Sequence, residues 1–152
     1  MHRHIFQKSI AAIAAGAIAA TSFAVLPSFS ASAAATILSS DFSNGSSGWS
    51  TYKASGGSCS MGVENGKLAL TVNSVGTLNY SVQVGYDVVP LYQNGVYRLK
   101  YDISSTEDCT VEQMIQQNGG TYQSYTWKGL DLTAETQTVD YTFTMKKETD
   151  IM

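Results

Sequence analysis

One stretch of the chain combines aromatic rings with neutral amides. It contains Gln113, Gln116, Gln117, Asn118, Tyr122, Gln123, Tyr125 and Trp127. A tyrosine has a flat apolar face and a hydroxyl, and a sugar ring has an apolar C–H face fringed by hydroxyls, so the two surfaces are complementary. Amides add donors and acceptors without the desolvation cost of a charge. The pattern predicts a carbohydrate-contacting face; the competing interpretation is that the tyrosines fill the core and the amides are solvated.

The chain has too few histidines and cysteines for several common kinds of catalytic and metal site. The two histidines, His2 and His4, lie in the first 33 residues, which we assign below to a cleavable segment. The rest of the chain therefore has no imidazole for a Ser-His-Asp triad, a Cys-His pair or a histidine-zinc site. Cys59 and Cys109 are too few for a four-thiolate metal site. In an oxidising compartment they could form a disulfide, and the alternative is two small buried apolar side chains.

Strands must position these residues, because apolar and polar side chains alternate with period two. The alternation is clearest over residues 96–103, where Tyr97, Leu99, Tyr101 and Ile103 share one face, and Arg98, Lys100 and Asp102 share the other. Further strands are predicted over residues 67–72, 78–84, 110–116, 122–127 and 139–145, which makes six a minimum. Asn-Gly and Gly-Gly pairs between them suit tight turns. The fold class predicted is all-β, an antiparallel β-sandwich.

The first 33 residues resemble a secretory signal peptide. A basic start is followed by an apolar run over residues 10–26, and Ala31-Ser32-Ala33 forms a small-residue cleavage site. We therefore exclude residues 1–33 from the predicted fold. Residues 34–152 are enough for one domain with its own core. The prediction is a secreted, extracellular protein.

The net charge of the processed chain excludes some classes of binding partner. Without Arg3 and Lys8, the nine basic residues fall to seven against twelve acidic ones, which gives a net charge of −5. A phosphate surface would repel this charge, so nucleic acid and anionic lipid are excluded as partners. The later apolar runs are far shorter than the ~20 residues that a membrane-spanning helix needs. No membrane association is expected after signal cleavage.

The end of the chain does not close the predicted sandwich. The last predicted strand runs directly into residues 146–152, with no turn and no evident partner. A sandwich that stopped there would leave an unpaired edge. This pattern predicts that the final strand or strands are missing and that the chain belongs to a longer gene product. The alternative is a small complete domain with a frayed tail.

Five motifs, taken in order, resemble the family 4/9 carbohydrate-binding modules of bacterial cellulases and xylanases. They are Asp41–Trp49, Asn65–Leu68, Asn94–Tyr97, Gln117–Tyr122 and Thr138–Phe143. The likeness covers nearly all of residues 37–145. It implies a β-jelly roll whose concave face forms an open cleft for single chains of soluble or amorphous β-glucan, cellulose or xylan. It also implies a covalently linked catalytic domain.

The resemblance carries family roles onto particular positions. Tyr52 and Tyr122 match the aromatic residues that flank the cleft, and Asn118 matches a polar cleft residue. Trp49 opens the domain beside Gly48, with no polar neighbours arranged to bind a sugar, so we interpret it as a structural plug.

Three further positions match less closely. Tyr80 falls near a position that a stacking aromatic often occupies. In an alternating strand, however, it would share a face with Val82 and Val84, so the alternative is that Tyr80 lies in the core. Asp87 lies where a cleft amide is expected. Glu112 occupies a position where some members carry an arginine, which reverses the charge and leaves the identity of the sugar open.

The resemblance also implies a structural calcium ion. Asp41 and the carbonyl of Gly66 match ligand positions, and oxygen ligands suit this hard cation. The matching late aspartate would lie in the segment predicted to be missing.

Alternative functions come from two other classes. The domain could be a glycoside hydrolase, which needs two acids roughly 5 to 10 Å apart, and Asp87 and Glu112 are the acids placed nearest the cleft. It could also be a cell-surface adhesion or scaffold domain of the same fold. The favoured hypothesis is a noncatalytic module that binds polysaccharide or oligosaccharide.

Overall fold

The computed structural model describes residues 4–14, 34–86 and 88–151, and these residues form strands and turns without a helix. The ten strands are β1 (His4–Ala14), β2 (Thr36–Ser40), β3 (Trp49–Lys53), β4 (Gly57–Glu64), β5 (Lys67–Val75), β6 (Val82–Tyr86), β7 (Val96–Ser105), β8 (Cys109–Gln116), β9 (Ser124–Leu132) and β10 (Gln137–Thr144). Every strand pairing is antiparallel. The predicted all-β class is confirmed.

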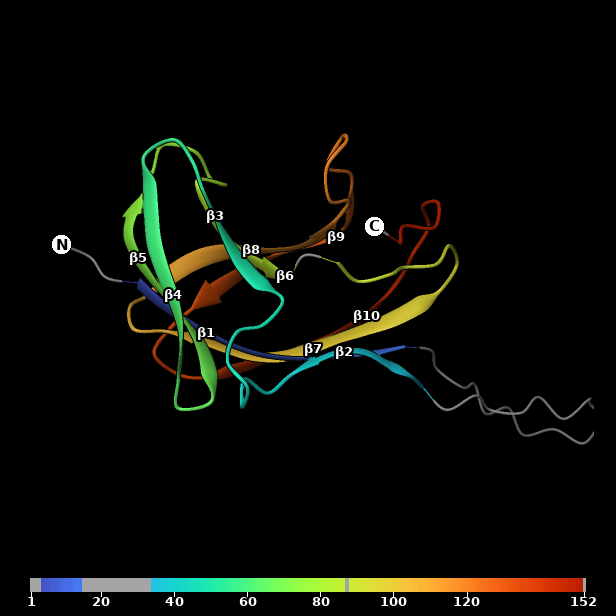
Figure 1. Cartoon of the computed structure of the whole chain (residues 1–152), viewed down its shortest axis with the longest axis horizontal. Helices are drawn as coiled ribbons and strands as arrows, with labels where there is room; N and C mark the ends of the chain where they lie inside the picture. Colours follow the sequence, from blue (N-terminus) through green and yellow to red (C-terminus); the bar gives the residue numbers. More distant parts are fainter. Residues whose placement is uncertain (1–3, 15–33, 87, 152) are drawn as a thin grey trace, which may run out of the picture.

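The strands make one large sheet and two ribbons. The large sheet has the order β10-β7-β1-β5-β4, with β2 paired to β1, and the ribbons are β3-β6 and β8-β9. Figure 1 shows both ribbons on one side of the long strands β7 and β1. The buried clusters lie between these layers, which makes the molecule a β-sandwich.

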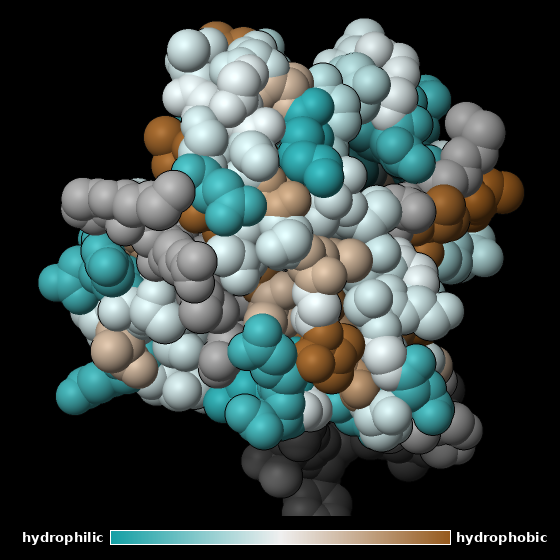
Figure 2. Space-filling view, turned by 60° about the vertical axis from the view of Figure 1, so that its left-hand side comes forward, coloured by the Kyte–Doolittle hydropathy of each residue, from teal (hydrophilic) through white to brown (hydrophobic). Residues whose placement is uncertain are grey.

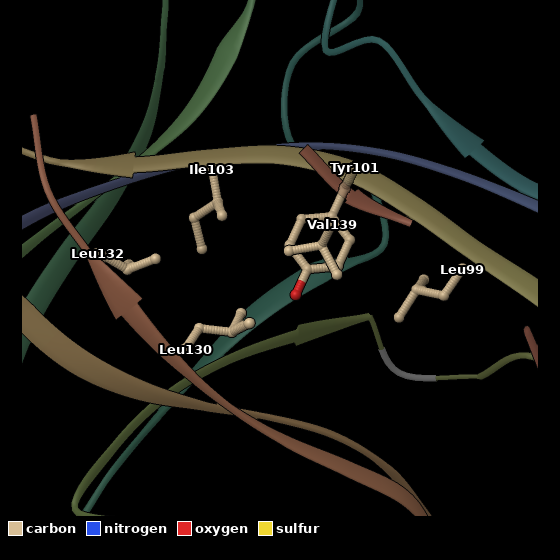
Figure 3. Packing of buried hydrophobic residues seen from close by; sticks show 6 residues of the cluster. All are labelled: Leu99, Tyr101, Ile103, Leu130, Leu132 and Val139. Atoms are coloured by element: carbon tan, nitrogen blue, oxygen red, sulfur yellow. The ribbon is translucent and has the colours of Figure 1, made fainter. Parts of the chain in front are cut away.

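The core follows the predicted alternation of β7. Leu99, Tyr101 and Ile103 are buried, whereas the charged residues between them are exposed. They pack against Leu130 and Leu132 of β9, which approach from the opposite layer in Figure 3. Burying apolar surface between two layers is the main favourable contribution to folding. This contact therefore holds the β8-β9 ribbon against the sheet.

Trp49 fills a second part of the core. It is 8% exposed, packs with Phe42 and Leu68, and donates its indole N–H to Ser40 Oγ at 3.1 Å. The predicted role as a structural plug is confirmed.

Two predicted strands begin later than expected. β6 begins at Val82, because Ser81 closes a turn onto Leu78: Ser81 N donates to Leu78 O, and Leu78 N donates to Ser81 Oγ, both at 3.0 Å. β9 begins at Ser124, because Tyr122 has a φ of 52° and belongs to the preceding loop. Strands β2, β3 and β4 were not predicted, since their serine and glycine content hides the apolar alternation.

The two cysteines are free thiols in separate places. Cys59 of β4 is buried with Leu70 and Val72, whereas Cys109 of β8 packs against the β7-β9 cluster. Cys59 therefore fits the interpretation of a small buried apolar side chain, whereas Cys109 is half-buried.

The C-terminal tail is paired, which residues 146–152 by themselves did not indicate, while the absence of a further strand beside β10 stays a prediction. Met145 is fully buried, and its backbone exchanges hydrogen bonds with Asn94 and Gly95. Farther along, Asp150 forms an antiparallel bridge with Leu91. The chain between β6 and β7 thus receives the tail, a long-range pairing that the local pattern of residues 146–152 did not indicate.

The N-terminal segment departs most from the sequence-based expectation. We excluded residues 1–33 from the fold, yet the backbone of β1 lies between β5 and β7. It pairs with β7 at nine positions and with β5 at five. Without β1, both neighbouring strands would present unpaired N–H and C=O groups to water at the middle of the sheet. Cleavage after Ala33 remains a prediction.

A buried polar contact joins the β8-β9 ribbon to β10. Gln113 is 8% exposed, and its side-chain oxygen accepts a hydrogen bond from the Tyr141 hydroxyl at 2.5 Å. Thr126 Oγ1 donates to the same hydroxyl at 3.5 Å, and the Lys128 ammonium lies 4.9 Å from the centre of the Tyr141 ring. Tyr141 therefore positions both strands of the ribbon.

Replacing Tyr141 by Phe should lower the free energy of unfolding by about 1 to 3 kcal/mol, because the buried Gln113 oxygen loses its donor. Urea denaturation followed by circular dichroism measures the change. Tyr52→Phe is the matched control, since the Tyr52 side chain is 54% exposed and should be close to neutral. Equal effects of the two substitutions would show that the Gln113 contact is not stabilising.

Deleting residues 1–33 from the 152-residue chain should lower the thermal unfolding midpoint and increase binding of an apolar dye. The reason is that β5 and β7 lose the strand that pairs with both of them. Adding a synthetic peptide of residues 4–14 should restore the midpoint. The same peptide with Ile10→Pro should not, since proline removes a donor of the ladder. An unchanged midpoint after deletion would mean that β1 contributes nothing to the sheet.

Candidate functional site

The outward face of the β8-β9 ribbon is exposed and carries the predicted site residue Glu112 together with Trp127. Successive cross-strand pairs on this face are Thr110 with Asp131, Glu112 with Gly129, and Met114 with Trp127. All six residues are exposed, and we call them the ribbon face. Their neighbours in sequence, including Leu130 and Leu132, point into the core. The alternation of a half-buried strand therefore produces this surface.

The β3-β6 ribbon is connected to this face through the turn at residues 78–81, which precedes β6. Tyr52 lies opposite Gln83 in the register of β3 and β6, and Gln83 Nε2 donates to the carbonyl of Tyr80 at 3.0 Å. The adjacent Asn79 donates from Nδ2 to Glu112 Oε2 at 3.4 Å. Three predicted site residues, Tyr52, Tyr80 and Glu112, are thus linked by a short series of contacts.

The competing core role of Tyr80 is wrong. Its side chain is 51% exposed, whereas Val82 and Val84 of β6 pack against the core. The parity comparison failed because Tyr80 precedes the strand and lies in the turn closed by Ser81.

Asn118 and Tyr122 lie together in the loop that joins β8 to β9. Gln117 N donates to Gln123 O at 2.9 Å, and Tyr122 N donates to Gly119 O at 3.0 Å. Both predicted residues are exposed, and Tyr122 is 61% exposed. The loop therefore presents an aromatic ring and an amide to solvent at one end of the ribbon.

A cleft of about 360 Å³ separates this loop from the C-terminal tail. Its walls include Gln117 and Gln123 from the loop, and Lys147 and Asp150 from the tail. Tyr125 also lines it and donates its hydroxyl to Asp150 Oδ2 at 2.6 Å. Desolvation, together with this contact to the carboxylate, raises the pKa of Tyr125 to about 12. The Tyr125 hydroxyl therefore holds the tail in place.

The structure thus places the residues of the amide-rich stretch in different environments. Trp127 and Tyr122 are exposed, Tyr125 binds the tail, and Gln113 is buried against Tyr141. The prediction that Gln113 belongs to a sugar-contacting surface is wrong, because strand parity turns it inward. Asp87 lies outside the described residues, so the predicted Asp87 and Glu112 acid pair has no measured separation.

The chain has few charged residues. Figure 2 shows a face of mostly intermediate hydropathy, on which strongly hydrophilic and apolar side chains form small separate patches. Only 14% of the residues of the chain are charged. A neutral, hydroxyl-rich ligand can approach such a surface without a large electrostatic penalty.

The residues predicted to bind calcium, Asp41 and Gly66, lie in two different loops. Asp41 Oδ1 accepts hydrogen bonds from Ser43 N at 2.9 Å and from Ser43 Oγ at 2.8 Å, and these bonds lower the pKa of Asp41. Gly66 lies in the turn between β4 and β5. Within the described ranges, no three acidic, histidine or cysteine residues gather into a possible metal site. Calcium takes six to eight oxygens, which include carbonyl and water oxygens, so binding through Asp41 and Gly66 stays a prediction.

No helix suited to crossing a bilayer occurs in the described part of the chain.

Comparison with known proteins indicates the family to which the chain belongs. Residues 34–151 match the CBM_4_9 family model, described as a carbohydrate binding domain. A cellulose 1,4-beta-cellobiosidase from Acetivibrio thermocellus is 34% identical over 113 residues, which are 67% of this chain and 13% of that protein. Endoglucanase C from Cellulomonas fimi is 31% identical over 127 residues, which are 84% of this chain and 11% of that protein. The chain spans a small part of either relative.

A solved structure described as "CBM4 structure and function" has the same fold. It superposes with a TM-score of 0.61 at 24% identity, covering 69% of this chain and 71% of the other. The antiparallel β-sandwich predicted from the strand pattern is therefore confirmed. Because the family match covers more than three quarters of the chain, from Ala34 to Ile151, the protein belongs to the CBM_4_9 family of carbohydrate binding domains and is a noncatalytic binding module.

Proposed function

We propose that this module binds single chains of soluble or amorphous polysaccharide, of the β-glucan, cellulose or xylan class, and holds a linked glycoside hydrolase close to them. One observation carries the proposal. Exposed aromatic rings and neutral amides gather along the two ribbons, with Tyr52 and Tyr122 exposed by 54% and 61%. Neither ring points into the interior. Such rings suit the apolar faces of sugars.

The ligand class is supported by the chemistry of the site. Each tyrosine can stack on one sugar ring, while the amides of Asn79 and Asn118 can bond to hydroxyls. Because these groups are uncharged, they need little desolvation energy to bind a neutral chain. The two relatives are a cellobiosidase and an endoglucanase by name, which favours a β-1,4-linked glucan.

The benefit of binding lies in effective concentration. A hydrolase tethered to a bound module meets its substrate at a local concentration set by the linker, without any new contact in its own active site. The relatives are about eight to nine times as long as their aligned regions, which supports a covalently linked catalytic domain.

Secretion is the corresponding proposal for the N-terminal segment. The basic start, the apolar run and Ala31-Ser32-Ala33 support cleavage after residue 33. Removal of β1 would open the position between β5 and β7. A strand from elsewhere in a longer polypeptide would then have to complete the sheet.

Replacing Tyr122 by Ala should weaken polysaccharide binding by about 1 to 3 kcal/mol, because an aromatic anchor is removed from the ligand surface. Affinity gel electrophoresis with soluble β-glucan and xylan identifies the ligand, and calorimetric titration with an oligosaccharide of that glycan measures the loss. Tyr92→Ala is the control: its ring is 60% exposed but lies between β6 and β7.

Two results would contradict the proposal. The first is an absence of retardation by every polysaccharide tested. The second is release of reducing sugar by the purified protein, which would favour the hydrolase alternative. Equal affinity of the Tyr122→Ala variant and the unaltered chain would remove Tyr122 from the site.

A further inference from the structure

We propose that Trp127 is the central stacking platform of the glycan site, with Glu112 beside it selecting neutral chains over acidic ones. This inference rests on the proposed function and deepens it. Trp127 did not emerge from the family resemblance as a site residue. The structure distinguishes it by its exposure, its partner across the ribbon and its place between the two groups of predicted residues.

Trp127 belongs to an exposed apolar pair. Its side chain is 57% exposed, and Met114, directly opposite in the register of β8 and β9, is 42% exposed. Cross-strand partners on one face lie close enough for their side chains to touch. A single exposed apolar residue needs no explanation, but a contiguous pair that includes tryptophan is typical of a binding surface.

The indole extends along the ribbon toward Gly129. Two carbons of its six-membered ring, Cη2 and Cζ2, lie 3.7 and 3.9 Å from the place where a β carbon of Gly129 would stand. Gly129 pairs with Glu112 across the ribbon. Because glycine has no side chain, the surface beside the ring stays low, and a sugar on the indole can approach Glu112.

Trp127 also lies between the two groups of predicted site residues. Its partner Met114 is two residues from Glu112 on the same strand, about 7 Å along β8. In the other direction, the ribbon ends in the loop that carries Asn118 and Tyr122. A glycan laid from Tyr122 toward Glu112 and the Asn79-Tyr80 turn therefore passes over Trp127.

The charges on the ribbon face determine which glycan fits. Glu112 can accept a hydrogen bond from a sugar hydroxyl, while its Oε2 accepts one from Asn79 at 3.4 Å. Asp131, at the end of the same face, adds a second carboxylate. The carboxylate of a uronic acid would be repelled by both groups. The face is thus suited to neutral chains such as unsubstituted β-glucan.

Intrinsic fluorescence tests the platform directly, because the chain has only two tryptophans, Trp49 and Trp127. Trp49 is buried at 8% exposure and should be insensitive to ligand. Titrating the 152-residue chain with cellohexaose should shift the tryptophan emission and protect Trp127 from acrylamide quenching. In Trp127→Phe the change should disappear, while the remaining emission of Trp49 reports that the fold is intact.

Affinity supplies the second readout. Trp127→Ala should weaken cellohexaose binding about tenfold or more by calorimetry, as expected for a central aromatic anchor, whereas Tyr92→Ala should leave it unchanged. Glu112→Gln should raise the affinity for a glucuronic-acid-substituted xylan relative to cellohexaose by about threefold or more, because a repulsive charge is removed.

The outcomes separate this inference from the proposed function. If the unaltered chain binds cellohexaose but its tryptophan emission is constant and Trp127→Ala binds equally well, the platform is wrong and the glycan-binding function stands. If no polysaccharide binds the unaltered chain, both fail. An unchanged preference in Glu112→Gln would overturn the selective role of Glu112 alone.

Discussion

The apolar contact between β7 and the β8-β9 ribbon is the constraint on which the rest of the molecule depends. Leu99, Tyr101 and Ile103 of β7 are buried against Leu130 and Leu132 of β9. Because side chains alternate along a strand, turning these leucines inward turns Trp127 and its neighbours on the ribbon outward. The interior thus determines which side chains of the ribbon face outward.

Polar contacts between distant residues then fix the inner side of the β8-β9 ribbon and the tail beside its loop. The Tyr141 hydroxyl holds Gln113 on the inner side of the ribbon, and the Tyr125 hydroxyl ties the tail to the β8-β9 loop through Asp150. Each bond joins residues that are far apart in sequence. A buried amide or a hydroxyl with such a partner is stabilising, whereas the same group without one would be costly.

The position of β1 bears on the prediction that the sandwich lacks a strand. The tail pattern indicated that the sandwich lacked a strand, and the structure has β1 at the centre of the sheet between β5 and β7. A sheet interrupted at that position would leave two rows of backbone groups unpaired. Cleavage after Ala33, which stays a prediction, would remove β1 and leave the facing edges of β5 and β7 unpaired.

The sequence by itself determined the fold class and the faces of β7, because period-two alternation and turn residues are local properties. The aromatic candidates Tyr52 and Tyr122 came from the resemblance to the family. The sequence did not determine which side chains face the core and which face the solvent where polar and aromatic residues are mixed. Gln113 and Trp127 stand in the same amide-rich and aromatic stretch, and only tertiary structure decided that Gln113 is buried and Trp127 exposed. The physical reason is that a polar residue can be buried when a distant partner satisfies it, and Tyr141 lies 28 residues away.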